Sequence, residues 1–569
     1  MSRHLWQAMP IRRRSRVQRV RRERLMGRLD AESAVGHTNF LRPLLGGFYV
    51  TDLLVAMVSF MSSALCTCAL AELLDTACIG AWYVFFSLPR DIFLRWRCAR
   101  RAARSGGSQP TVFGLLLLCT IHFVLRYMPF AMPRIAMASE TLNPFVQWRT
   151  GGMAPVLTRA YHGAGFRAFW LTNTYEAREL PNRFVMLYLH GGGFALSSSA
   201  MYVEALLRIM ALAWQRSAHG ASLECVTLEY DLTPHARFPV ALLQALRCYA
   251  HLVEVKRVDP ARIVLAGDSA GGNLVMSMLL VLSGQTRRAD VCERNWTMLP
   301  MPARAILVSP WLDLRAAEAQ MYAPLRDTPS ARTSSESSTL DFIAAESLLQ
   351  FAQLYSDIIP RPRRVAGPIA RVLARPWAAA LRDRLRRPAL TGAPAFASVE
   401  GDSHVVDCPM QLYAPPLFQH SLLMDPLVSP VLGDWTRVQL PYGLFVTWGE
   451  EERMATDIAT WVTRIALDGA ATLRMETHTE PGAFGVHIWP FVSMYVGASV
   501  RERERGLEML ADAVLDLALP TYTHDTSPAS MPSDCEPDVV EREAAQRAWE
   551  AELARMGHEQ PLPSPVHVY

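Results

Sequence analysis

The sequence predicts an α/β fold, in which a mostly parallel central sheet carries helices on both faces, behind an apolar helical region at the N-terminus. Two observations predict the sheet: short apolar runs bounded by polar, Gly or Pro residues occur from about residue 150 onward, and helical patterns lie between them. A third observation predicts the N-terminal region, because long uncharged stretches are concentrated before about residue 135. The 569 residues are too many for one ordinary domain, so we expect one main domain with additional segments.

The N-terminal region, residues 1–150, combines a basic tail with three apolar segments. Residues 11–28 carry nine arginines and one acidic residue. The apolar segments are Leu53–Ala71, Thr76–Leu88 and Thr111–Met132, and the first has 19 uncharged residues, enough to cross a bilayer as a helix. A cleavable signal peptide fits poorly, because the first apolar run begins about fifty residues into the chain. We expect a membrane anchor; the alternative is a set of interfacial or cap helices that dock on the catalytic domain.

The charge pattern favours a membrane surface over nucleic acid. The net charge of +4 is small for this length, and the arginine-rich run lies directly ahead of the apolar stretches. If the first two apolar segments form a hairpin, the basic flanks at 11–28 and 95–104 both face the cytosol. We expect an anchor in the endoplasmic reticulum, with the catalytic domain lumenal if the third segment spans and cytosolic if it does not. A glycan on the sequon Asn295-Trp296-Thr297 would indicate the lumenal side.

Cysteine usage gives no sign of a metal site. The ten cysteines form no C-x-x-C pair, and no Cys/His cluster has the spacing of zinc ligands. The simplest explanation is that they are small apolar residues in helices. A disulfide among the later cysteines stays open for a domain in an oxidising lumen; the candidates are Cys225, Cys248, Cys292 and Cys408.

Residues 151–520 are the expected catalytic domain. Its buried strands are expected at Phe184–Leu189, Leu223–Leu228, Arg262–Ala266, Ala305–Val308 and Gly443–Thr447, with helical patterns such as Val240–Val255 and Gly272–Leu282 between them. Ser/Thr-rich and Arg/Pro/Ala-rich stretches within 313–420 predict an insertion at about 356–408. The polar tail at 521–569 is typical of a partly disordered appendage.

The strongest chemical signal is Gly267-Asp268-Ser269-Ala270-Gly271, a G-x-S-x-G pattern. It directly follows the apolar strand RIVLA and opens the helical pattern GGNLVMSMLL. The serine of such a pattern sits on a sharp strand-to-helix turn, where small neighbours let its hydroxyl project from the sheet. The bare pattern occurs by chance in many proteins, but the strand before it and the helix after it favour Ser269 as a nucleophile.

A second signal, His190-Gly191-Gly192-Gly193-Phe194, follows the strand FVMLYL. Three consecutive glycines leave the backbone free to turn its N–H groups toward a ligand, as an acyl-transfer site requires for the oxygen of the tetrahedral intermediate. A flexible turn is the ordinary explanation of a glycine run. The nucleophile downstream favours an oxyanion hole instead, to which the N–H of the residue after the nucleophile would contribute.

A serine nucleophile needs a base, and the base needs an acid behind it. In hydrolases whose serine sits on such a strand-to-helix turn, the acid follows the serine in the chain and the histidine comes last. His487 fits the base, because it follows a glycine-containing turn downstream of the last clear strand. The acid is expected at the end of the strand Gly443–Thr447, where Glu450, Glu451 and Glu452 are adjacent. Sequence logic alone does not choose among the three.

Together these residues resemble the hormone-sensitive-lipase-like branch of the α/β-hydrolases, with its arylacetamide deacetylases and fungal steryl acetyl hydrolases. The resemblance covers roughly 180–315 and 420–500. Beside HGGGF and GDSAGG it includes EYDLTP at 229–234, SPWLD at 309–313 and DPLVSP at 425–430. It implies an α/β-hydrolase fold.

The resemblance also implies roles for the oxyanion hole and the base. Gly192 and Gly193 would donate their N–H groups to the oxyanion together with Ala270. The segment Gly485-Val486-His487-Ile488-Trp489-Pro490 is similar to the family's H-x-W-P, which implies that His487 is the base.

For the acid, the family pattern has a carboxylate two residues before a leucine-like position. Met454 in that position selects Glu452, with Glu450 as the next choice. Most relatives have aspartate there, so the glutamate is a departure. The N-terminal apolar segments and the long insertion are departures from the family's cap, which forms the substrate pockets.

The sequence therefore predicts a serine carboxylesterase or deacetylase that acts on short-acyl esters of lipophilic alcohols, similar to sterol acetates, with no metal and no organic cofactor. The expected partners are a small lipophilic ester and a membrane, and no nucleic acid. A lipase or an amidase acting on other lipophilic substrates is the alternative. A non-catalytic ligand receptor is a more distant one, since a receptor on this fold would show a broken triad.

Overall fold

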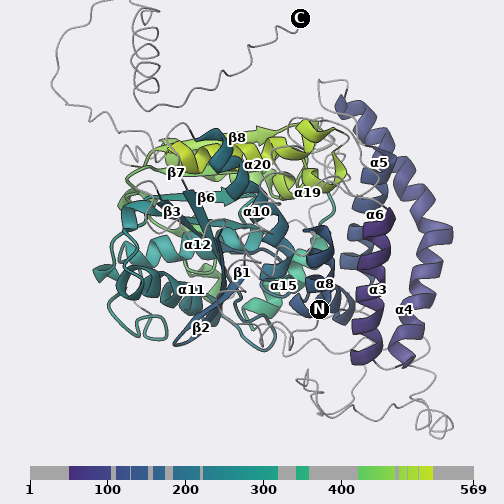
Figure 1. Cartoon of the computed structure of the whole chain (residues 1–569), viewed down its shortest axis with the longest axis horizontal. Coiled ribbons are helices and arrows are strands. Elements are labelled where there is room, and N and C mark those ends of the chain that lie inside the picture. The colour runs from purple at the N-terminus through teal and green to yellow at the C-terminus, as the bar shows by residue number, and fades with distance from the viewer. Residues whose placement is uncertain are drawn as a thin grey trace, which may run out of the picture. The chain divides into compact units, whose positions relative to one another are not determined.

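An eight-stranded sheet forms the centre of the molecule (Figure 1). The computed structural model describes residues 50–68, 70–103, 111–128, 130–150, 158–172, 183–217, 222–286, 288–317, 341–357, 421–467, 473–482, 485–497 and 499–516. The strands follow the order β1-β2-β4-β3-β5-β6-β7-β8. Their bounds are β1 Thr158–Gly163, β2 Phe166–Leu171, β3 Arg183–Leu189, β4 Ser222–Leu228, β5 Ile263–Asp268, β6 Arg304–Val308, β7 Leu444–Gly449 and β8 Met475–Glu480.

The sheet is mostly parallel, which confirms the expected fold class. β1 pairs antiparallel with β2, and β2 pairs antiparallel with β4, whereas every pair from β4 to β8 is parallel. The five expected strands are β3 to β7, each within three residues of the expected bounds. The parallel strands end at one edge, where the loops after β3, β5, β7 and β8 bring the sequence-predicted site residues.

Helices cover both faces of the sheet, as expected (Figure 1). Alternate residues of β3 show this directly: Leu187 belongs to one hydrophobic cluster and Met186 to the other. The first cluster includes residues of α11 (Val240–Ala250, continued by a π-helical turn, η3, at His251–Val255), α12 (Ser269–Leu282), α15 (Ala345–Tyr355) and α18 (Ala455–Leu467). The second includes residues of α10 (Ser199–Arg216), α19 (Trp489–Val496) and α20 (Val500–Leu515).

Ahead of the sheet the structure has a series of helices, several of which run alongside one another in Figure 1. They are α3 (Val50–Thr67), α4 (Leu70–Trp82), the π-helical turn η1 (Tyr83–Ser87), α5 (Leu88–Ala103), α6 (Val112–Tyr127), α7 (Ala131–Ala136) and α8 (Ser139–Arg149). Within the described part of the chain, one helix, Glu72–Arg100, is long and apolar enough to cross a bilayer, and little of it is buried.

Two of the three apolar segments dock on the rest of the described protein, α3 through a buried ion pair and α6 through the hydrophobic core. On α3, Asp52 is fully buried and pairs with Arg149 at 2.9 Å, and Arg149 in turn pairs with Glu204 of α10 at 2.5 Å. On α6, Leu118 belongs to the core, and Gly114 lies against Val496 of α19. For α3 and α6 the structure therefore favours helices that dock on the catalytic domain, the alternative considered from the sequence.

The chain divides into two compact units, Met1–Leu519 and Pro520–Tyr569. The second unit, the basic run at 11–28 and all but the first two residues of the expected insertion at 356–408 lie outside the described residues. Cys225, Cys248 and Cys292 carry free thiols, so no disulfide joins them, and Cys408 lies outside the described residues.

Candidate active site

The turn between β5 and α12 places Ser269 at the C-terminal edge of the sheet. Ser269 is the first residue of α12 and has a φ of 50°, a left-handed conformation that non-glycine residues seldom adopt. The turn depends on the glycines around it, because a Cβ on Gly271 would lie 1.9 Å from the carbonyl oxygen of Leu189. A Cβ on Gly267 would lie 2.6 Å from the backbone of Gly271. The G-x-S-x-G pattern therefore forms the strained strand–turn–helix that its sequence predicts.

Two further motifs hold this turn from the side. The carbonyl oxygen of Ser269 accepts a hydrogen bond from the N–H of Trp311 at 3.0 Å. The Asn273 amide donates to the carbonyl oxygens of Trp311 at 2.8 Å and Val428 at 3.0 Å. SPWLD and DPLVSP, which carried part of the resemblance, thus fix the position of α12.

Asp268 connects the serine turn to the glycine loop. Its buried carboxylate accepts hydrogen bonds from the hydroxyls of Tyr188 at 2.6 Å and Tyr202 at 2.8 Å, and from the N–H of Gly191 at 2.9 Å. Burial raises the pKa of Asp268, and the two tyrosine hydroxyls oppose that rise only in part. The sequence marked Asp268 only as a motif position, and the structure adds this anchoring contact.

The glycine loop needs glycine at its centre. Gly192 has a φ of 110° and Gly193 a φ of 62°. A Cβ on Gly193 would lie 2.3 Å from the ring of Phe351 on α15. His190 stacks on Tyr230 with ring centroids 4.2 Å apart, and burial lowers the pKa of His190. The loop is therefore shaped by the backbone conformation of its glycines and by the neutral, stacked His190 ring. A loop fixed in this way can present backbone N–H groups to an oxyanion.

The structure brings His487 and Glu452 together at the ends of β7 and β8. Both side chains are buried, and His487 Nδ1 lies 3.7 Å from Glu452 Oε2, longer than a hydrogen bond but within electrostatic reach. Among the described residues, His487 Nε2 has no hydrogen-bond partner, which leaves it available to a serine hydroxyl.

Ser309 holds this pair from the end of β6. Its hydroxyl donates to Glu452 Oε2 at 2.5 Å and accepts from the N–H of Ile488 at 3.0 Å. The N–H of Gly449 also donates to Glu452 Oε2, at 3.3 Å. Sequence reasoning quoted Ser309 within SPWLD but gave it no role; its place after a buried strand was the available signal.

The other two glutamates of the run have different surroundings. Glu450 is exposed and accepts a hydrogen bond from the Thr479 hydroxyl at 3.3 Å. Glu451 is partly exposed, and its N–H donates to the carbonyl oxygen of Gly485. Glu452 is thus the member of the run that the structure places beside His487.

Mutual electrostatics perturb both buried groups. Burial raises the pKa of Glu452, and the His487 ring and the Ser309 hydroxyl offset this only in part. Burial alone would lower the pKa of His487, but Glu452 outweighs it, with smaller contributions from Asp341 and Asp268, so the pKa of His487 is raised. A buried histidine beside a buried carboxylate is the arrangement that stabilises an imidazolium during proton transfer.

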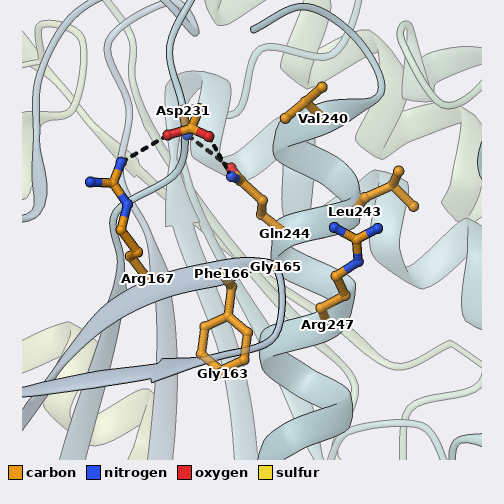
Figure 2. A pocket seen from close by; sticks show the side chains of 9 residues that line it. All are labelled: Gly163, Gly165, Phe166, Arg167, Asp231, Val240, Leu243, Gln244 and Arg247. Atoms are coloured by element: carbon orange, nitrogen blue, oxygen red, sulfur yellow. Dashed lines mark hydrogen bonds and ion pairs between the residues drawn. The ribbon is translucent and has the colours of Figure 1, made fainter.

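A separate pocket lies at the β1–β2 turn, next to α11. Its volume is about 490 Å³. Figure 2 shows that two of its polar side chains bind Asp231: Arg167 pairs with it at 2.8 Å, and the Gln244 amide donates to it at 2.7 Å. None of the sequence-predicted site residues lines it. Within the described residues, no group of three or more His, Cys, Asp or Glu side chains could hold a metal ion.

Comparison with known proteins agrees with the observed fold. The family described as alpha/beta hydrolase fold matches residues 186–358. This part of the chain has the α/β-hydrolase fold. The resemblance to the hormone-sensitive-lipase-like branch, predicted from the motifs, is confirmed by the relatives that the domain matches.

Three relatives show the level of similarity. Neutral cholesterol ester hydrolase 1 of Mus musculus is 27% identical over 206 residues, 35% of this chain and 46% of that protein. An acetyl-hydrolase of Streptomyces hygroscopicus is 36% identical over 129 residues, 23% of this chain and 36% of that protein. Arylacetamide deacetylase of Rattus norvegicus is 27% identical over 213 residues, 36% of this chain and 48% of that protein. The matched part of this chain thus spans less than half the length of each of these relatives.

Proposed function

We propose that the protein is a serine carboxylesterase or deacetylase that hydrolyses short-acyl esters of lipophilic alcohols, such as sterol acetates. The observation that carries the proposal is Ser269 in a strained turn at the same edge of the sheet as the buried pair of His487 and Glu452. Strain of this kind persists where the surrounding structure enforces it, which is typical of functional sites.

The mechanism is two-step acyl transfer. His487 Nε2 takes the proton of Ser269 as the serine oxygen bonds to the ester carbonyl carbon, and Glu452 orients the ring and stabilises the imidazolium. The tetrahedral intermediate collapses when the C–O bond to the alcohol breaks and His487 returns the proton to the leaving oxygen. Water then attacks the acyl-enzyme by the same steps and releases the acid.

The N–H groups of Gly192, Gly193 and Ala270 stabilise the negative oxygen of both intermediates. The left-handed backbone of the two glycines supports this role, because it turns consecutive N–H groups out of regular hydrogen bonding. The mechanism uses no metal ion and no organic cofactor.

A short acyl group is favoured by the packing around the glycine loop. The ring of Phe351 lies against Gly193, and Phe194 stacks on Tyr355 with ring centroids 3.7 Å apart. These aromatic rings restrict the space beside the oxyanion donors. Among the relatives, the names acetyl-hydrolase and deacetylase support a small acyl group, and the name cholesterol ester hydrolase supports a lipophilic alcohol.

Association with a membrane would deliver such esters. Apolar side chains on the long helix Glu72–Arg100 are exposed, among them Phe85 and Phe86. We propose the endoplasmic reticulum membrane as its location; the basic runs that flank its apolar segments support membrane anchoring. Asn295 of the sequon is exposed, so a glycan on it would distinguish a lumenal domain from a cytosolic one.

Hydrolysis of p-nitrophenyl acetate and p-nitrophenyl decanoate by the detergent-solubilised full chain tests the proposal. We expect kcat/KM to be higher for the acetate, and Ser269→Ala to lower kcat by about 10⁴-fold or more. Retained activity in Ser269→Ala would exclude this serine as the nucleophile. A wide preference for the decanoate would contradict the short-acyl specificity and favour the lipase alternative.

A further inference from the structure

Asp341, in the segment before α15, binds backbone on both sides of the His487–Glu452 pair. Its Oδ1 accepts from the N–H of His487 at 3.3 Å and from that of Phe342 at 2.8 Å, and its Oδ2 accepts from the N–H of Arg453 at 2.9 Å. Arg453 directly follows Glu452 in the chain. One carboxylate therefore joins the loop after β7 to the loop after β8.

The environment of Asp341 favours a specific role over simple packing. The side chain is 1% exposed, and a buried carboxylate is costly unless hydrogen bonds compensate it. Three backbone donors satisfy it here, and two of them come from loops that are far from Asp341 in sequence. A carboxylate accepts at both oxygens, so it can hold two loops in a fixed relation, which an apolar side chain cannot do.

The helices ahead of the sheet hold this segment in turn. Arg95 of α5, itself buried, donates to the carbonyl oxygen of Asp341 at 3.0 Å. His122 of α6 bonds to the carbonyl oxygen of Phe342 at 3.1 Å, and the Ser347 hydroxyl donates to the Leu125 carbonyl oxygen at 3.0 Å. The segment that carries Asp341 is thus fixed to α5 and α6.

We propose that Asp341 is a positioning residue, which locks the histidine loop to the acid loop, and that α5 and α6 hold it in place through Arg95 and His122. The proposal rests on the proposed function, since the loops that it joins carry the base and the acid. It makes these N-terminal helices part of the active-site framework.

Asp341 also contributes to the charge around the base. The acidic groups that act on His487 are Glu452 from the β7 loop, Asp268 from the β5 turn and Asp341 itself, and the neutral Phe342 ring lies 6.0 Å away. Two arginines contact Asp341: the Arg95 guanidinium donates to its carbonyl oxygen, and the backbone N–H of Arg453 donates to its carboxylate. Removing the Asp341 charge therefore lowers the pKa of His487 and lets the neutral base persist to lower pH.

The test compares Asp341→Asn with Asp290→Asn, a control at a half-exposed surface ion pair. For Asp341→Asn we expect kcat on p-nitrophenyl acetate to fall about 10- to 100-fold with little change in KM, because a displaced base loses most of its rate while binding is kept. We also expect the acidic limb of the pH profile of kcat/KM to move to lower pH, which a purely structural defect would not cause. Wild-type kcat and an unmoved acidic limb in the folded variant would overturn the proposal.

A second comparison keeps the proposal testable if Asp341→Asn does not fold. Arg95→Gln removes the contact from α5, whereas Arg97→Gln alters an exposed arginine of the same helix. We expect Arg95→Gln alone to lower kcat, by about tenfold. Equal kcat in the two arginine variants would exclude the role of α5.

The failure of the proposed function is separable from the failure of this proposal. If the wild type hydrolyses neither ester, the same variants are compared by the rate at which a fluorophosphonate labels Ser269, which requires an activated serine but no substrate specificity. Slower labelling in Asp341→Asn and Arg95→Gln would support the positioning role. Labelling at the wild-type rate, with the wild-type pH dependence, would overturn it.

Discussion

Glu450 and Glu452 are two residues apart and have opposite surroundings, one exposed and the other 4% exposed beside His487. We predict that Glu452→Gln lowers kcat about 10³- to 10⁴-fold, because the base loses the charge that orients it and stabilises its protonated form. Glu450→Gln should stay within about twofold of the wild type, as most surface substitutions do. Steady-state kinetics of the two variants on p-nitrophenyl acetate check this.

The pH dependence of kcat/KM is a second test of the same two glutamate variants, because the direction in which its acidic limb moves identifies the acid. The pKa of His487 is raised above its ordinary value, so activity that needs the neutral ring falls as the pH drops through this raised pKa. Loss of the Glu452 charge lowers the pKa of His487 and moves the acidic limb of kcat/KM to lower pH. An acidic limb that moves in Glu450→Gln and stays in place in Glu452→Gln would assign the acid to Glu450.

Among single site residues, the sequence predicts those that stand in a distinctive motif. Ser269 and His487 follow from chain order and from the strands before them. The acid did not follow from local pattern, because three adjacent glutamates differ only in how the turn after β7 directs them. Asp341 and Ser309 act through contacts more than 100 residues away in the chain, and no local pattern reports such contacts.

Among the helices, α3 is joined to the catalytic domain by a buried charge, the carboxylate of Asp52. Arg149 lies between Asp52 and Glu204, and all three side chains are almost fully buried. We predict that Arg149→Met lowers the free energy of unfolding by about 3–5 kcal/mol, because two buried carboxylates lose their cation. Thermal and denaturant unfolding of the detergent-solubilised protein measures the change.

Arg216 provides the matched control for this prediction. It forms an ion pair with Asp512 in which both side chains are more than two-fifths exposed. Arg216→Met should cost less than about 1 kcal/mol, since solvent screens such pairs. Equal losses in the two methionine variants would mean that the buried pair does not fasten α3.

The strands and helices differ in how clearly the local sequence predicts them. β3 to β7 are buried, apolar and bounded by polar residues, so the sequence predicts them. β8, with the sequence METHTE, is polar and partly exposed at the sheet edge, and β1 and β2 alternate at the other edge, so neither edge has the apolar signal. The sequence also did not predict the docking of α3 and α6, because an apolar segment can pack against protein as well as against lipid.

For the whole molecule, the exposed apolar side chains of the N-terminal helices predict membrane binding. Phe85 and Phe86 of η1 are 75% and 72% exposed. Burial of one such ring in lipid contributes about 1.5–3 kcal/mol, so Phe85→Ser with Phe86→Ser should lower partitioning into phosphatidylcholine vesicles at least about tenfold. Flotation on a density gradient measures the bound fraction.

The control for membrane binding uses apolar residues on the catalytic domain. Val255 and Met298 are 61% and 75% exposed and lie in η3 and near the sequon. Replacing both by serine should leave flotation unchanged. A loss of flotation in this variant, as large as in the phenylalanine pair, would show that binding is not specific to the N-terminal helices.

The hold of α5 on Asp341 has a practical consequence for anyone who wishes to make the enzyme water-soluble. Cutting the chain after the N-terminal helices removes the apolar surface, but it also removes Arg95 and His122, on which the segment before α15 rests. The better route keeps α5 and α6 and replaces only their outward apolar side chains, such as Phe93 and Val112, with polar ones. Solubility is therefore better improved by changing exposed side chains than by deleting helices, since α5 and α6 hold the segment that carries Asp341.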